Sequence, residues 1–480
     1  MTNKPFYLTT TLPYVNADPH IGFALEIVHA DIVARHLRNR GREVFFTTGT
    51  DEHGQKIFQK AAEMGQDVQA YVDHFAGQFE MLKQELNLSY DAFIRTTDEK
   101  HIRAAQELWR RCLQAGDIYK KKYKGLYCVG DEMFLKENDL SNGRCPNHPN
   151  MEPIEIEEEN YFFKLSAYQD KLLTYLSRED SVLPDWRRGE AIKFIEQGLE
   201  DFSISREKAR MSWGIPVVDD ESQVMYVWFD ALTNYISTLD WPDDAKGNFQ
   251  KFWIDGETVQ MAGKDQVRFQ SIMWQAMLMS AKLKTSDTVV YHGFITSGGQ
   301  KMSKSLGNVI EPFAIVQEYG TDALRYYLAR HISPFEDSDF TMEKFKDAYN
   351  ANLANGLGNL VSRVMKMAED NTQPISDLDD IVGMLVADDV HAKMDSFDIS
   401  QAMDVIWERI SSADLLIADL QPFKLVKTDP EGGVRLINSL KMELYSIAND
   451  LQAFLPETSQ KIKDAVRENK KPKTLFPRKE

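Results

Sequence analysis

The sequence predicts an α/β protein with a parallel sheet that is interrupted by an insertion, followed by an all-α C-terminal helix bundle. Residues 7–54 have the pattern of a strand, a helix and a second strand, which is one βαβ unit. From residue 116 to about 224 the pattern changes to alternating strands, loops and acidic stretches, and the α/β pattern returns over residues 225–297. From residue 350 onward apolar residues recur at helical spacing in long segments, which is typical of a bundle.

The composition is that of a globular protein with more than one core. A chain of 480 residues is expected to form about two to four domains, and 43% hydrophobic with 27% charged residues is an ordinary balance. No apolar run approaches the roughly 18 residues that span a bilayer, and no secretion signal is recognised. Three cysteines are too few for a disulfide framework, so we expect a cytoplasmic protein that binds no membrane. The net charge of −18 argues against general nucleic-acid binding but leaves local basic patches open.

The βαβ unit begins at a short β-prone run, Tyr7 to Leu12, which ends before Pro13 because proline cannot donate to a sheet ladder. The apolar spacing is helical from Phe23 to Gly41. Residues 43–48 form a second buried strand that leads into the segment GTDEHG at 49–54. A ligand site is expected where the carboxyl ends of these strands meet.

The turn before the first helix has the chemistry of a phosphate site. Gly22 allows close approach of the backbone, and His20 can donate a hydrogen bond to a phosphoryl oxygen. Taken alone, such a turn is more often an ordinary strand-to-helix connection. A second segment, KMSKS at 301–305, follows a strand and the pair Gly298-Gly299, and its two lysines beside a glycine hinge suit a mobile clamp for a polyphosphate.

The two segments together, PHIG at 19–22 and KMSKS at 301–305, resemble the signature pair of class I aminoacyl-tRNA synthetases. The blocks between them resemble the methionine-specific members of that family. They are TLPY at 11–14, GTDEHG at 49–54, WGIP at 213–216, VWFDA at 227–231 and GKD at 263–265. The resemblance runs from about residue 5 to the C-terminal region.

This resemblance implies a split Rossmann-type sheet with an inserted connective domain, followed by an anticodon-binding bundle. The expected domains are residues 1–115 with 225–297 for the catalytic domain, 116–224 for the connective insertion, 298–349 for the lysine-signature loop and helical connector, and 350–480 for the bundle. The implied activity is ATP-dependent activation of L-methionine and transfer to the 3′-terminal ribose of tRNA(Met) with a CAU anticodon. No dimerisation module is recognised, so a monomer is expected.

The resemblance also implies which residues act on ATP. His20, Lys301 and Lys304 are the expected catalytic residues. The expected ATP-binding residues are His20, Gly22, Phe23, Lys301, Ser303 and Lys304. ATP would be bound with Mg²⁺. The chain departs from the family at Phe23, where a His or Asn normally contacts the adenosine, and a lost hydrogen bond of this kind weakens binding by roughly 0.5–1.5 kcal/mol.

A methionine pocket needs an anion for the ammonium group and an aromatic wall for the thioether, where each sulfur–aromatic contact adds about 0.3–1.5 kcal/mol. The residues expected to form it, by resemblance, are Leu12, Tyr14, Asp51, Trp228, Ala231, Tyr235, Gln270 and Trp274. Without the resemblance, the aromatic residues would more often be plain core. The chain departs from the family at Gln266 and Gln270, where an apolar residue and a His are usual.

Within the insertion, Cys128-x-x-Asp131 and Cys145-x-x-His148 have the spacing of a zinc knuckle with four ligands. Many family members carry Cys in place of Asp131. The spacing predicts a structural Zn²⁺ bound by Cys128, Asp131, Cys145 and His148, because a carboxylate can also bind zinc. The alternative is a metal-free knuckle held by its prolines and apolar neighbours.

In the bundle, Asn359 and Arg363 lie four residues apart on one helix face and match the family's anticodon-facing pair. Phe423 stands where the family usually has Trp, and its ring can stack on a base or, alternatively, pack in the core. Two rival functions remain open at this point. One is a synthetase for another apolar or sulfur amino acid, against which the block at 49–54 and the aromatic set argue. The other is a non-catalytic paralogue acting as an RNA- or protein-binding module, which Phe23, Gln270 and Phe423 would suit but the intact His20, Lys301, Lys304 and Asp51 argue against.

Overall fold

The computed structural model describes residues 4–128, 133–135, 140–146, 150–302, 307–376, 378 and 388–480. The chain divides into two compact units, each assembled from three stretches of sequence. Unit 1 comprises Met1–Pro19, Arg42–Met81 and Tyr90–Tyr291, and unit 2 comprises His20–Gly41, Leu82–Ser89 and His292–Glu480. The first helix, α1 (Ile21–Asn39), therefore belongs to unit 2 although it follows the first strand of unit 1 in the sequence.

Unit 1 is built on a six-stranded sheet in the order β3-β2-β1-β12-β13-β7. The strands are β1 (Phe6–Thr9), β2 (Val44–Thr50), β3 (Ala92–Arg95), β7 (Val182–Leu183), β12 (Glu257–Gly263) and β13 (Thr288–His292). β1 pairs in parallel with both β2 and β12, so that Phe6 lies opposite Val44 and Glu257. All four residues of β1 are buried, as expected for a parallel strand covered on both faces. Because β12 returns beside β1 after a long insertion, the predicted split parallel sheet is confirmed.

The helices of unit 1 pack around this sheet. They are α2 (Gln55–Glu63), α3 (Val68–Glu85), α4 (Glu99–Gln114), η2 (Leu165–Tyr168), α5 (Gln169–Leu176), α6 (Asp185–Glu196), α7 (Val227–Leu232), α8 (Asn234–Ser237), η3 (Phe249–Ile254), η4 (Lys264–Gln266), η5 (Phe269–Met273) and α9 (Trp274–Ser280). One face of α4 is apolar and turns towards the core. Its residues recur at helical spacing and are all buried: Ala104, Ala105, Leu108, Trp109 and Cys112. They join a large core cluster of unit 1 that also contains Trp253 and Trp274.

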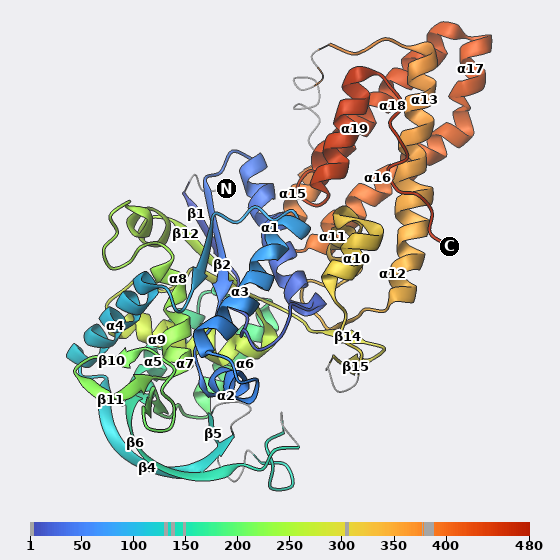
Figure 1. Ribbon diagram of the computed structural model, residues 1–480. Helices are drawn as coiled ribbons and strands as arrows, with labels where there is room; N and C mark the ends of the chain where they lie inside the picture. Colours follow the sequence, from blue (N-terminus) through green and yellow to red (C-terminus); the bar gives the residue numbers. More distant parts are fainter. Residues whose placement is uncertain are drawn as a thin grey trace. The chain divides into compact units, whose positions relative to one another are not determined.

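The insertion contributes two small sheets. One has the order β5-β4-β6-β8 and the other the order β10-β11-β9. Their strands are β4 (Ile118–Cys128), β5 (Met133–Leu135), β6 (Ile154–Phe163), β8 (Phe202–Ser203), β9 (Ser205–Glu207), β10 (Pro216–Val217) and β11 (Asp220–Met225). β4 and β6 are the long curved antiparallel pair in cyan and green (Figure 1). Opposite charges face each other across this pair, as in the contact of 2.8 Å between Lys124 and Glu155.

Unit 2 contains a small hairpin sheet and an all-α region. The strands are β14 (Ile295–Ser297), β15 (Gln300–Lys301) and β16 (Ser338–Asp339). The helices after α1 are α10 (Pro312–Tyr319), α11 (Thr321–Arg330), α12 (Met342–Ala348), η7 (Tyr349–Gly358), α13 (Asn359–Asn371), α15 (Asp388–Asp395), α16 (Ile399–Leu420), α17 (Pro422–Thr428), α18 (Pro430–Leu451) and α19 (Pro456–Glu468). α13 packs against α16, α17, α18 and α19, which confirms the predicted C-terminal bundle (Figure 1).

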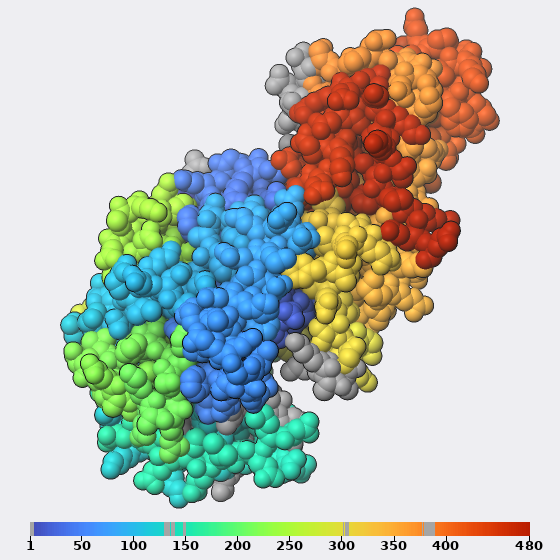
Figure 2. Space-filling view, viewed as in Figure 1, coloured from blue at the N-terminus to red at the C-terminus, as the bar shows by residue number. Residues whose placement is uncertain are grey.

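The last residues of the chain return along unit 2. The Tyr349 hydroxyl donates to the carbonyl oxygen of Pro477 at 2.9 Å, and the Asn350 amide donates to that of Lys479 at 2.8 Å. The Lys479 ammonium in turn donates to the carbonyl oxygen of Glu318 at 2.7 Å. Figure 2 shows this dark red end lying against the yellow and orange surface of the helices that precede the bundle.

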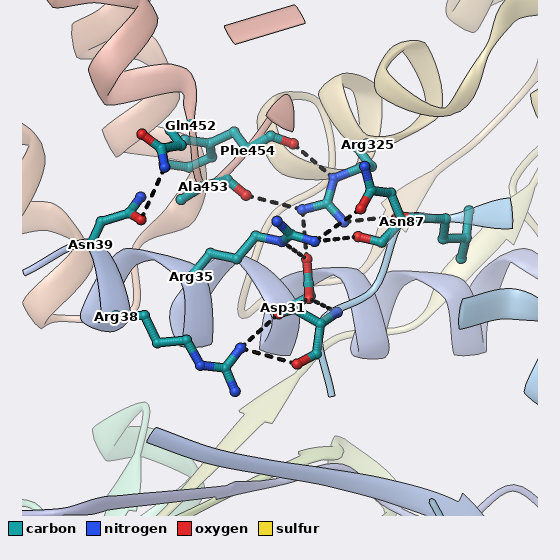
Figure 3. Close-up of polar contacts among 11 residues, drawn as sticks. Asp31, Arg35, Arg38, Asn39, Asn87, Arg325, Gln452, Ala453 and Phe454 are labelled. Carbon is teal, nitrogen blue, oxygen red and sulfur yellow. Dashed lines mark hydrogen bonds and ion pairs between the residues drawn. The ribbon is translucent and has the colours of Figure 1, made fainter. Parts of the chain in front are cut away.

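A fully buried arginine connects the first helix of unit 2 with the turn between its last two. Arg325 on α11 and Asp31 on α1 are both 0% exposed, and Nη2 of Arg325 lies 2.8 Å from Oδ2 of Asp31. The same guanidinium donates hydrogen bonds to the carbonyl oxygens of Leu86, Ala453 and Phe454, at 3.0, 3.0 and 2.8 Å (Figure 3). One cation therefore binds oxygen atoms from three separate stretches of sequence.

A second contact joins α1 to the turn between α18 and α19. The side chain of Gln452 donates to the amide oxygen of Asn39, at 3.3 Å and across 413 residues of sequence (Figure 3).

Among the helices that the structure describes, none combines the length and the apolar character needed to cross a membrane.

Candidate functional site

A cavity of about 310 Å³ lies in unit 1 next to the carboxyl ends of β1, β2 and β12. Its lining residues are Thr11, Leu12, Tyr14, Asp51, Lys56, Val227, Trp228, Ala231, Leu232, Asn234, Tyr235, Gln266 and Phe269. β1 ends at Thr9, β2 at Thr50 and β12 at Gly263, so the segments just after these three neighbouring strands supply part of the lining. This is the place where parallel α/β sheets bind ligands.

Asp51 is the only acidic side chain among the described residues that line the cavity. Its position is fixed by the backbone, because its N–H donates to the carbonyl oxygen of Pro13 at 2.9 Å and its own carbonyl accepts from Val15 at 3.1 Å. An isolated parallel bridge pairs it with Tyr14. A carboxylate that is only 8% exposed and borders a small cavity can bind the ammonium group of an amino acid.

The aromatic wall of the cavity is formed by rings that support one another. Trp228 and Phe269 make an edge-to-face contact with centroids 4.0 Å apart. Tyr235 also lines the cavity, and its hydroxyl accepts a hydrogen bond of 2.6 Å from the Gln270 amide. Trp274 packs against Tyr235 at 5.7 Å and is fully buried. Gln270 and Trp274 therefore lie behind Tyr235 and do not line the cavity.

The structure thus brings six of the eight residues predicted for methionine binding to one cavity, namely Leu12, Tyr14, Asp51, Trp228, Ala231 and Tyr235. Their role in binding methionine stays a prediction. The sequence reasoning missed Thr11, Lys56, Val227, Leu232, Asn234 and Phe269 as lining residues. Val227 and Leu232 could have been found, because they flank Trp228 and Ala231 at helical spacing on α7.

The residue after Asp51 is anchored by a buried ion pair. Glu52 is fully buried and accepts hydrogen bonds from Arg95 at 2.6 and 2.9 Å and from the Thr97 hydroxyl at 2.6 Å. Its carbonyl oxygen accepts a hydrogen bond of 2.6 Å from the indole of Trp213, which belongs to the predicted WGIP block. These contacts fix the backbone from which Asp51 reaches the cavity.

In unit 2, His20 caps α1. Its Nδ1 accepts a hydrogen bond of 3.0 Å from the Gly22 N–H, so the neutral imidazole carries its proton on Nε2. Neighbouring atoms desolvate the ring and lower its pKa, although part of the residue meets solvent. Gly22 is needed because a Cβ there would lie 2.9 Å from the His20 ring. Phe23 follows as the third residue after the cap.

The second predicted phosphate-binding segment begins in a hairpin. β14 and β15 are antiparallel, and the turn between them has positive φ at Gly298 and Gly299, 61° and 73°, which suits a glycine pair. The Gly299 N–H donates to Oδ1 of Asp339 at 2.8 Å. The backbone of Lys301 lies in β15, whereas Ser303 and Lys304 are outside the described residues. The role of this segment stays a prediction.

The predicted zinc ligands are described only in part. Cys128 and Cys145 are both buried and lie in one small cluster with Leu135, so the two predicted thiol ligands come together. Asp131 and His148 are outside the described residues. Within the described ranges, no group of three or more His, Cys, Asp or Glu side chains is placed to hold a metal.

The three predicted anticodon-facing residues lie on the bundle. Asn359 begins α13 and is exposed, and Arg363 is half-buried with an ion pair of 3.1 Å to Asp414. Phe423, at the start of α17, is 45% exposed. This exposure removes the alternative that Phe423 is a core residue. Leu415, Leu416 and Leu420, which precede it, are also exposed, so this end of the bundle has an apolar surface.

Comparison with known proteins agrees with this geometry. The family model described as tRNA synthetases class I (M) matches residues 6–152 and 139–365. A methionine–tRNA ligase of Rhizobium meliloti (strain 1021) is 41% identical over 479 residues, covering 96% of this chain and 92% of the relative. That of Thermotoga maritima is 41% identical over 490 residues, covering 97% of this chain and 76% of the relative.

Solved structures give the same result. The Mycobacterium tuberculosis methionyl-tRNA synthetase in complex with methionyl-adenylate matches with a TM-score of 0.88 and 37% identity, over 96% of this chain and 93% of that chain. Its apo form matches with a TM-score of 0.83 and 33% identity, over 99% of this chain and 98% of that chain.

Proposed function

This chain belongs to the methionine-specific class I aminoacyl-tRNA synthetases, and from that membership we propose how its own residues perform the reaction. It activates L-methionine with ATP to methionyl-adenylate, releasing pyrophosphate, and transfers the methionyl group to the 3′-terminal ribose of tRNA, releasing AMP. We assign it the tRNA(Met) that carries a CAU anticodon.

Methionine is held by the cavity of unit 1. Asp51 binds the ammonium group, with the backbone of Leu12 beside it, and the thioether lies against Trp228 and Tyr235. The observation that carries this proposal is the cavity itself, in which a single described carboxylate and an aromatic wall line about 310 Å³. That volume falls at the lower end of the roughly 300–1,000 Å³ range of small-molecule sites.

In the first step an oxygen of the methionine carboxylate attacks the α-phosphorus of ATP, and the bond to pyrophosphate breaks. Positioning and charge stabilisation are the protein's main contributions to such a transfer. His20 donates its Nε2 proton as a hydrogen bond to a phosphoryl oxygen, which the acceptor role of its Nδ1 towards Gly22 supports. Lys301 and Lys304 neutralise charge on the departing pyrophosphate, and Gly22, Phe23 and Ser303 complete the ATP site.

In the second step the terminal ribose hydroxyl of tRNA attacks the carbonyl carbon of methionyl-adenylate, and AMP leaves. Asn359 and Arg363 supply hydrogen bonds to the anticodon, and Phe423 supplies a stacking face. The exposure of Phe423 and of the neighbouring leucines supports this assignment, because a base stacks only on a ring that solvent can reach.

Two metals belong to the proposal. ATP binds as its Mg²⁺ complex, which supplies charge neutralisation at the phosphates. A structural Zn²⁺ is bound by Cys128, Asp131, Cys145 and His148. The joint burial of the two cysteines supports this, since thiolates are common zinc ligands.

We further propose that residues 1–115 with 225–297 form the catalytic domain, 116–224 the connective insertion, 298–349 the lysine-signature loop and connector, and 350–480 the anticodon-binding bundle. The protein acts as a monomer in the cytoplasm, where its tRNA substrate is found. Size-exclusion chromatography with light scattering tests the first point, and a mass near 110 kDa, about twice the 55.1 kDa of the chain, would refute it.

The activity is tested by methionine-dependent ATP–pyrophosphate exchange without tRNA, run with each amino acid in turn. We expect exchange with methionine and a fall of orders of magnitude in Lys304→Ala, because the charged transition state loses a partner. The matched control is Lys461→Ala, which removes an exposed lysine of α19 and should leave exchange unchanged. Equal exchange with another amino acid would refute methionine specificity, and a wild-type rate in Lys304→Ala would refute the role of that lysine.

A further inference from the structure

One buried carboxylate lies between two histidines beside the methionine cavity. Oδ2 of Asp230 is 2.7 Å from Nδ1 of His53, and its Oδ1 is 2.7 Å from Nε2 of His101. Asp230 and His101 are 0% exposed and His53 is 5% exposed. On its far side, His101 contacts the Ser237 hydroxyl through Nδ1 at 2.9 Å. None of these four residues lines the cavity.

This cluster connects two walls of the cavity. His53 is two residues beyond Asp51, the proposed ammonium ligand. Asp230 is on α7 two residues beyond Trp228 and adjacent to Ala231, which both line the cavity. His101 is on α4, so the carboxylate joins the end of β2, α7 and a helix of the core. The connection between Asp51 and Trp228 thus runs through one hydrogen bond, from His53 to Asp230, and the bond from His101 holds the same carboxylate from the side of α4.

The electrostatics favour a charged Asp230. Burial alone would raise the pKa of this carboxyl, but the interactions with His53 and His101 outweigh burial and lower it below its ordinary value. Burying a charge costs several kcal/mol, and a protein with apolar residues of similar volume in place of a buried ion pair is often equally stable or more stable. What a buried charged hydrogen bond adds over apolar packing is a fixed direction and distance.

We propose that Asp230, His53 and His101 are positioning residues that set the distance between Asp51 and Trp228, and with it the length of side chain that the cavity accepts. The proposal rests on the proposed function, since it concerns discrimination among amino acids in the activation step. The ligand class it defines is an unbranched thioether amino acid of the length of methionine.

The test uses amide substitutions that keep or lose the bond to Asp230. At position 101 the bond is made by Nε2. The side-chain amide nitrogen of His101→Gln can take the place of Nε2, whereas the side chain of His101→Asn is too short for its nitrogen to reach Asp230. At position 53 the bond is made by Nδ1, so His53→Asn keeps it and His53→Gln does not. The order of the two amides is therefore reversed between the two positions.

The readout is the ratio of kcat/KM for methionine to that for ethionine, which is one methylene longer, in pyrophosphate exchange. This ratio does not depend on the fraction of enzyme that is folded. One methylene is worth about 10–200-fold in a well-fitted pocket. We expect the ratio to fall about tenfold in His101→Asn and His53→Gln, and to stay within about twofold of wild type in His101→Gln and His53→Asn.

The control for lost packing is Cys112→Ala. Cys112 is a fully buried residue of α4, the helix of His101, and its thiol lies 3.8 Å from the carbonyl oxygen of Met277. This variant should melt at a lower temperature with an unchanged ratio. The proposal is overturned if the ratio follows amide size at both positions, or if neither bond-losing variant changes it. If one of those variants does not fold, the pair at the other position decides. A wild-type enzyme without methionine-dependent exchange would instead refute the proposed function.

Discussion

Replacing Arg325 by methionine removes a buried cation while keeping most of its volume. Asp31 would stay as a fully buried carboxylate with Arg35 as its remaining cation, and the carbonyl oxygens of Leu86, Ala453 and Phe454 would each lose a donor. Breaking a buried ion pair at one partner costs about 3–5 kcal/mol. Because whole domains are stable by only about 5–15 kcal/mol, the variant should lose a large part of the stability of unit 2.

The assay must report on unit 2 alone, because a chain with two units need not unfold in one step. Of the eight tryptophans in the sequence, only Trp407 belongs to unit 2. Urea titration of protein labelled with 5-fluorotryptophan, followed by ¹⁹F NMR at the Trp407 resonance, therefore gives the free energy of unfolding of this unit. The resonance is assigned by its loss in Trp407→Phe.

The matched control is Lys366→Met on α13 of the same unit. Lys366 pairs with Asp370 at 2.7 Å, both side chains are about half exposed, and such surface pairs contribute little to stability. A loss in Arg325→Met no larger than in Lys366→Met would refute the reasoning. The reasoning would also be refuted if the losses of unfolding free energy in Arg325→Met and Asp31→Asn added up to that of the double variant within about 0.5 kcal/mol, because two paired charges must couple.

The pH dependence gives the same reasoning a second test. Burial alone would raise the pKa of Asp31, but Arg325 and Arg35 outweigh it, so the pKa lies below its ordinary value. A lowered carboxyl pKa contributes stability above the unfolded pKa of about 3.9, and this contribution is lost as the pH falls through the folded pKa. The destabilisation of Arg325→Met should therefore be full at neutral pH and shrink below about pH 4.

Four further predictions concern other parts of the chain. Asp51→Asn should raise the methionine KM about tenfold to a hundredfold and the ATP KM much less, measured by pyrophosphate exchange, since a charged hydrogen bond is worth about 1.5–3 kcal/mol; an unchanged methionine KM would place the amine elsewhere. Phe423→Ala should weaken tRNA binding by about 1–3 kcal/mol in a filter-binding assay with little change in melting temperature, whereas a large drop in melting temperature would contradict its exposed position. Elemental analysis should find about one zinc per chain, bound more tightly after Asp131→Cys, and zinc-free protein prepared without chelator would favour the metal-free knuckle. Burial raises the pKa of Asp450 to about 6 despite Arg409, so the contribution of this carboxyl to stability is present below about pH 4 and lost as the pH rises through about 6. Asp450→Asn should therefore raise the urea midpoint of unit 2 at pH 8 but not at pH 4. An equal midpoint of variant and wild type at pH 8 would show that Arg409 compensates the charge.

The order of the main elements followed from the sequence because long periodic segments carry a strong signal. Short ones do not. The apolar spacing of residues 58–115 predicts helix throughout, yet β3 occupies Ala92–Arg95, since four residues are too few for a period to decide between strand and helix. The pair Gly432-Gly433 predicts a break between helices of the bundle, but α18 begins before it at Pro430. A Cβ at Gly433 would lie 2.5 Å from Val426, so this glycine allows the close approach of α17 and α18.

The site shows a similar limit. Tyr14, Asp51 and Trp228 were found as lining residues because they stand in short blocks with a recognisable order, whereas Phe269 stands in none of these blocks and was missed. The partners of the neighbouring residues could not be found in this way. Glu52 binds Arg95 across 43 residues of sequence, and His53 binds Asp230 across 177. Such pairs depend on how the chain folds back, which no local pattern records.

The division of unit 2 into three stretches has a consequence for synthesis on the ribosome. Helix α1 is made early, but the Gln452 side chain that contacts its Asn39 follows 413 residues later. At the roughly 5–20 residues per second of translation, α1 waits about 20 to 80 s for this partner. The face of α1 that packs against α11 in the finished unit waits until α11 has been made at residues 321–330, and until then it is a candidate for chaperone binding. Slow codons or a limited supply of chaperones should therefore lower the yield of folded protein. We expect this loss to arise at α1 more than at the bundle helices, whose partners emerge from the ribosome soon after them.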